Sequence, residues 1–149
     1  MYTDKEISKI QAEFWTVFGL YMKPVPGVSG DKVNWINYKT NIKHLTFNLN
    51  FTDKIASLLI KISHPEFIDQ KKFYKTFASL KDELINFPAP LNFKESNDTI
   101  TPVSTIDCSL FNVNIFNKET WPDAISFLKH SMIALDMFWQ SNKIIFEML

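Results

Sequence analysis

The feature that most constrains the fold is an alternation of apolar and polar side chains from Lys43 to Phe51. In an extended strand successive side chains point to opposite faces, so a period of two predicts a β-strand. The apolar face of this strand carries Leu45, Phe47, Leu49 and Phe51, and the other face carries His44, Thr46, Asn48 and Asn50.

The segments on either side extend this strand into a predicted sheet. Val33–Lys39 is rich in β-forming residues, and Thr40-Asn41 is a plausible turn. After a second turn at Thr52–Lys54, one face of a third strand is formed by Ala56, Leu58, Ile60 and Ile62. Three strands joined by short turns predict an antiparallel meander.

Helices are predicted before and after this meander. Thr3-Asp4-Lys5-Glu6 has the form of a capping box, and apolar residues recur at helical spacing up to Tyr21. The Pro- and Gly-rich stretch Lys23–Gly30 ends this helix. Ser63-His64-Pro65-Glu66 has the same capping form and predicts a middle helix that runs to about Ile85.

The C-terminal part predicts a second hairpin and a long helix. The hairpin joins Leu91–Lys94 to Thr99–Cys108, with Pro102 placing the latter towards an edge, and Phe111–Phe116 adds a short strand. The helix follows Thr120–Asp123, with a break near Ser131. Its apolar seam runs through Ile125, Leu128, Met132, Leu135, Trp139, Asn142, Phe146 and Leu149. Such a seam packs on the protein's own core or forms a helical homodimer, with Asn142 as the polar register residue.

Together these segments predict one α+β domain spanning residues 1–149. Its mainly antiparallel sheet would have five to six strands, packed by an N-terminal, a middle and a long C-terminal helix in the order α-β-β-β-α-β-β-α. The 46% hydrophobic content of the 149 residues is enough for a core. No apolar run is long enough to span a membrane. The lack of a secretory signal at Met1–Ile10 and the single cysteine, Cys108, lead us to expect a cytoplasmic protein.

Few residues suggest metal or cofactor chemistry, and we predict no metal site, no cofactor and no catalytic residue. The three histidines are far apart, and no phosphate-binding glycine loop is present. All sixteen basic residues are Lys, which argues against the bidentate reading of DNA bases that Arg provides.

The segment Trp35–Thr40 is the best candidate for a ligand site. It combines aromatic, amide and cationic side chains beside a Gly/Pro loop, a mixture that can stack a base or sugar and hold a phosphate. The candidate ligand-binding residues in it are Trp35, Asn37, Tyr38 and Lys39. The alternative is that Trp35 belongs to the core and Lys39 is simply solvated.

Two further candidates lie outside this segment. His64 stands where a strand gives way to a helix, where it either serves a ligand or bonds the helix start. Lys61 lies on the third strand. The order helix, meander, helix, strand resembles restriction-endonuclease-like nucleases, which hold Mg²⁺ between carboxylates. Here the second strand offers only Asn48 and Asn50, and Lys61 stands without a Glu.

Several collinear motifs resemble a bacterial family of domains of unknown function. They are Glu13-Phe14-Trp15, Tyr21-Met22-Lys23-Pro24-Val25-Pro26, Val33-Asn34-Trp35-Ile36-Asn37-Tyr38-Lys39-Thr40, Ile62-Ser63-His64-Pro65, Phe116-Asn117-Lys118-Glu119, Trp121-Pro122, Ile125-Ser126-Phe127, Ile133-Ala134-Leu135-Asp136 and Phe138-Trp139. The resemblance implies a short stand-alone protein, or a module appended to longer proteins with nuclease-like parts. Where the family has an Arg, an Asp and a Glu, this chain has Asn48, Asn50 and Lys61, so the resemblance weakens an enzymatic interpretation.

We therefore expect a non-catalytic binding or interaction module with an unknown ligand, self-associating through the C-terminal helix. The alternative is a degenerate nuclease-like domain that binds nucleic acid through Trp35, Tyr38, Lys39 and Lys61.

Overall fold

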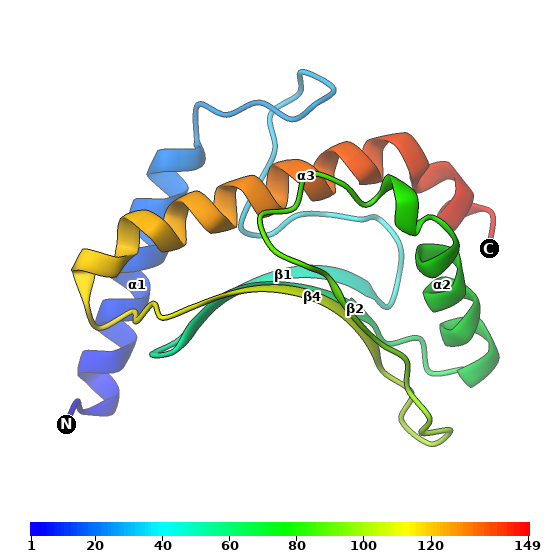
Figure 1. The fold of residues 1–149 in the computed structure, drawn as a ribbon, viewed down its shortest axis with the longest axis horizontal. Coiled ribbons are helices and arrows are strands. Elements are labelled where there is room, and N and C mark those ends of the chain that lie inside the picture. The colour runs from blue at the N-terminus through cyan, green and yellow to red at the C-terminus, as the bar shows by residue number, and fades with distance from the viewer.

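The computed structural model describes residues 1–149 as three helices and a four-stranded antiparallel sheet (Figure 1). The elements are α1 (Asp4–Met22), β1 (Leu45–Phe51), β2 (Ile55–Ile62), α2 (Phe67–Ser79), β3 (Asn92–Lys94), β4 (Ser104–Phe111) and α3 (Trp121–Glu147), with short 3₁₀ turns η1 (Lys81–Glu83) and η2 (Lys118–Thr120). None of the helices combines the length and the hydropathy needed to cross a bilayer.

The period of two does produce a strand, from Leu45 to Phe51, whereas the predicted first residues Lys43 and His44 lie in the turn before it. In β1 the apolar face turns toward the helices, and Phe47 meets Trp139 of α3 edge-on, with ring centroids 5.3 Å apart. The sheet order is β1-β2-β4-β3, and Leu45 pairs with Ile62 at one end of the β1–β2 hairpin. Thr52 N donates to Ile55 O at 2.8 Å across the turn.

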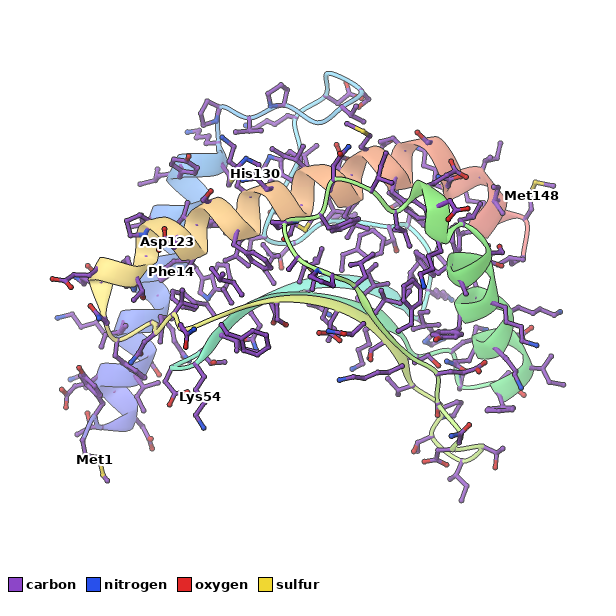
Figure 2. The ribbon with its side chains drawn as sticks, viewed as in Figure 1. Met1, Phe14, Lys54, Asp123, His130 and Met148 are labelled. Atoms are coloured by element: carbon purple, nitrogen blue, oxygen red, sulfur yellow. The ribbon has the colours of Figure 1, made fainter.

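The helix α3 covers one face of the sheet, and α1 and α2 lie near its two ends (Figure 1). Aromatic side chains fill the junctions. Phe14 of α1 points toward α3 and meets Trp121 at 5.2 Å (Figure 2), and Phe77 of α2 meets Phe146 at 4.4 Å. The opposite face of the sheet carries no helix.

Five features of the predicted fold are wrong. The sheet has four strands because Val33–Lys39 is irregular and the chain after Phe111, the last residue of β4, forms no further strand up to Phe116. Ile115 makes only one ladder-like bond, from its N to Thr52 O. The meander is therefore a two-stranded hairpin, which removes the nuclease-like element order. The strand β4 lies inside the sheet, between β2 and β3, because Pro102 precedes its first residue and takes no ladder position. The helix α3 is continuous through Ser131, and α2 ends at Ser79.

Of the two roles predicted for the apolar seam of α3, packing within the protein is the one that the structure shows. All the predicted seam residues from Ile125 to Phe146 are buried within this chain, and only Leu149 is exposed. Asn142 is not a register residue between two copies, since its Nδ2 donates to Phe138 O at 3.0 Å. The seam therefore serves the protein's own core.

Candidate functional site

A long loop between α1 and β1, residues 23–44, lies over α3, and together they line a hollow (Figure 1). Close packing begins at Gly27, where a Cβ atom would lie 2.5 Å from Val33 Cγ2, so no larger residue fits without movement. Gly30 adopts a φ of 87°, which only glycine takes without strain. The indole of Trp35 is 4% exposed, and its Nε1 donates to Val25 O at 3.0 Å. The loop is thereby closed on itself.

A buried carboxylate attaches this loop to α3. Asp136 is 1% exposed and accepts two hydrogen bonds, from Tyr38 Oη at 2.5 Å and from Val28 N at 2.8 Å. Burial and the hydrogen bond to Asp136 raise the pKa of the Tyr38 hydroxyl far above its usual value of 10.0. Tyr38 therefore remains a proton donor at any physiological pH.

Two more side chains of α3 continue this contact outward. Lys143 Nζ donates to Gln140 Oε1 at 2.9 Å, and Gln140 Nε2 donates to Tyr38 Oη at 3.2 Å. All the donors point the same way, from the exposed ammonium of Lys143 to the buried carboxylate of Asp136. Such a chain polarises each bond in the same sense and fixes the orientation of every member.

Tyr38, Gln140 and Lys143 line a hollow of about 520 Å³, which we call the lysine cleft. Its cations are Lys32, Lys39 and Lys143, and none of these lysines forms a salt bridge. The acid at its border is Asp31, whose Oδ2 accepts from Ser29 Oγ at 3.4 Å. Amide side chains from Asn34, Asn37 and Gln140 complete the polar lining. The arrangement suits an anionic ligand with hydrogen-bond acceptors.

The structure therefore brings together three of the predicted site residues, Asn37, Tyr38 and Lys39. Trp35 is a core residue by burial, and it also lines a neighbouring hollow. This burial favours the alternative in which Trp35 packs and Lys39 remains free. The stacking role predicted for Trp35 thus loses its exposed aromatic face.

The two other predicted residues lie elsewhere. His64 Nδ1 accepts from Glu66 N at 3.1 Å just before α2, and the predicted capping box around it is not formed. The His64 ring lies 5.1 Å from that of His44 in a separate hollow that also includes Asp69, Lys72 and the C-terminal Leu149. These contacts make His64 part of the helix start rather than of the lysine cleft.

Lys61 lies on the helix-free face of the sheet, in a row where it pairs with Thr46 on one side and Thr105 on the other. Asn48 and Asn50 belong to the same face. The carboxylate there is Asp107, whose Oδ1 lies 3.9 Å from Lys94 Nζ and whose Oδ2 accepts from Asn92 at 3.4 Å. No group of three or more His, Cys, Asp or Glu side chains is placed to hold a metal ion.

Sequence reasoning missed Lys32, Asp136, Gln140 and Lys143. One of them left a signal: Asp136 is a single acid between Leu135 and Met137 in the most apolar part of a helix. A charge placed there is either costly or held by partners, and here it has two. Lys32, Gln140 and Lys143 stand among other polar residues and left no such signal.

The fold and the cleft define a class of protein: a small α+β domain that presents a cationic hollow built by one loop and one helix. The chain belongs to a family of domains of unknown function, DUF4268, whose family model matches residues 10–143. No curated protein and no solved structure gives a significant match to this chain.

Proposed function

We propose that this protein is a non-catalytic binding module that holds the phosphate groups of a nucleic acid in the lysine cleft. The observation that carries the proposal is the convergence of Lys32, Lys39 and Lys143 on one hollow without a salt-bridge partner. Three lysines outnumber the single acid of the cleft, Asp31, so their charges repel one another, and an anionic ligand relieves that repulsion.

The fixed geometry of the cleft supports the same function. Gln140 orients Lys143, and Tyr38 orients Gln140. These side chains therefore lose less conformational entropy when a ligand binds. The amides of Asn34, Asn37 and Gln140 can donate to phosphate oxygens between the ammonium groups. Lys contacts the charged phosphates and not the base edges, so we expect the binding to have little preference for base sequence.

A salt titration tests this function. Fluorescence anisotropy would measure the affinity for a labelled oligothymidylate at several salt concentrations. Three displaced counterions give a slope of about −2 in log K against log salt for single strands. The triple variant Lys32→Gln, Lys39→Gln, Lys143→Gln should lose most of the affinity and nearly all of the slope.

The matched control removes the same charge elsewhere. Lys5, Lys54 and Lys75 are exposed, form no salt bridge and lie outside the lysine cleft. Lys54, for example, projects from the β1–β2 turn, away from α3 (Figure 2). The triple variant Lys5→Gln, Lys54→Gln, Lys75→Gln should bind nearly as the unchanged protein does. Equal losses in the two triple variants would mean that only net charge matters, and the cleft would not be the site.

A further inference from the structure

A second hollow adjoins the lysine cleft and differs from it in chemistry. It has a volume of about 440 Å³ and lies between the end of α1 and the loop. Its apolar lining comes from Gly19, Met22, Val33, Trp35 and Ile36, and we call it the apolar cleft. Its polar groups are Lys23, Lys32 and Asn34.

The two clefts share a short segment of the loop as part of their lining. Lys32, Val33 and Asn34 line both of them. A ligand that occupies both therefore needs an apolar part next to an anionic part. Asn34 Oδ1 already accepts from Asn37 N at 3.0 Å, which leaves its amide Nδ2 free to donate at the border.

Gly19 opens the floor of the apolar cleft. Glycine inside a helix is unfavourable relative to alanine, so its presence in α1 calls for a local reason. A Cβ atom at this position would lie 3.5 Å from Ile36 Cδ1, which is ordinary contact. A longer side chain would extend beyond that contact into the cleft.

We infer that the two clefts together hold one nucleotide of a single-stranded nucleic acid, with its base in the apolar cleft and its phosphate in the lysine cleft. This inference rests on the proposed function, which concerns the phosphate, and adds a binding site for the base of the same nucleotide. A base has apolar faces and lies one sugar away from its phosphate, which matches an apolar hollow that shares a wall with a cationic one. A paired base would have to leave its stack to enter, at a cost that an unpaired base does not meet.

Three ligands separate the parts of the inference: an oligothymidylate of about twelve nucleotides, an abasic oligomer of the same length, and a duplex of that length. Anisotropy should show the base-bearing single strand binding about tenfold more tightly than the abasic oligomer. The duplex should bind no more tightly than the abasic oligomer. Thymidine monophosphate, used as a competitor, should bind more weakly than the oligomer because it meets the lysines with one phosphate only.

Gly19→Leu is the decisive variant because it fills the apolar cleft and leaves every lysine in place. It should reduce the affinity for the oligothymidylate about tenfold and leave the affinity for the abasic oligomer unchanged. Gly19→Ala should bind nearly as before. Ala12→Leu adds similar bulk at an exposed position of the same helix and should change neither affinity.

The outcomes distinguish this inference from the function on which it rests. Equal affinity for the abasic and base-bearing strands, with no effect of Gly19→Leu, would overturn the base site and leave the phosphate site standing. Tighter binding of the duplex, or of the monophosphate, would overturn the single strand as the ligand. Absence of binding to all the oligomers would overturn both proposals.

Discussion

Tyr38 donates a 2.5 Å hydrogen bond to Asp136, a carboxylate 98 residues further along the chain that is almost entirely buried. This contact joins the loop that forms the clefts to the helix that fills the core. It also places the Tyr38 hydroxyl where Gln140 can reach it from one turn further along α3. The shape of the lysine cleft therefore depends on this contact.

The Tyr38–Asp136 pair should show a measurable coupling free energy. Asp136→Ala leaves the Tyr38 hydroxyl and Val28 N without their acceptor, and we expect a loss of about 2–4 kcal/mol in the free energy of unfolding. Tyr38→Phe should cost about 1–2 kcal/mol. Urea unfolding of both single variants and the double variant gives the coupling, which we expect to be about 1–3 kcal/mol. Purely additive losses would show that the two side chains do not stabilise the fold as a pair.

Alkaline pH should weaken the fold through Tyr38. The pKa of its hydroxyl is raised in the folded state, so the folded protein keeps a proton that the unfolded chain releases above its ordinary pKa of 10.0. The stabilisation is fully present below that pH and is lost as the pH rises above it, by up to about 1.4 kcal/mol per pH unit. Urea unfolding at about pH 9 and about pH 11 should show a smaller loss for Tyr38→Phe than for the unchanged protein. Identical losses would assign the alkaline sensitivity to other groups.

Gly27 should tolerate no side chain. Gly27→Ala places its Cβ against Val33 Cγ2, and a β-branched side chain cannot turn away easily, so we expect a loss of about 1–3 kcal/mol. Adding Val33→Ala should restore part of the stability, because it removes the opposing methyl groups. Thermal unfolding of the single and double variants measures this recovery. If Val33→Ala restores nothing, the restriction at Gly27 has another origin.

Gly30→Ala is the comparison for Gly27. A Cβ atom there meets no neighbour within 4 Å, but the φ of 87° is unfavourable for alanine. The expected cost is about 1–2 kcal/mol from backbone strain alone. Val33→Ala should not relieve it, since the two residues do not compete for space.

The seam of α3 should behave as core and not as a subunit interface. Leu135→Ala removes a fully buried side chain and should lower the free energy of unfolding by about 2–5 kcal/mol. Urea midpoints measured at two protein concentrations should coincide, because unfolding of a single chain does not depend on concentration. A midpoint that rises with concentration would return the seam to a role in self-association.

Local patterns in the sequence were enough to predict several elements. The period of two in β1, the capping box at Thr3 and the long apolar stripe of α3 are confirmed, because each depends on residues a few positions apart. The strand predicted at Val33–Lys39 is wrong because local residue type favoured a strand there while distant contacts determined the structure. Its aromatic residues are β-forming by type, yet Trp35 is used to close the loop on Val25 and Tyr38 to reach α3.

The sequence by itself determined the three helices and the two hairpins, β1–β2 and β3–β4, since periodicity, capping and turn residues act over a few positions. It also marked Asn37, Tyr38 and Lys39 as polar and aromatic residues with binding chemistry. Only the tertiary structure decided that Lys32 and Lys143 join them, that Trp35 is buried and that the seam of α3 faces inward. The physical reason is distance along the chain. Gln140 lies 102 residues from Tyr38, and such a contact depends on how the whole core packs rather than on any pattern in its neighbours.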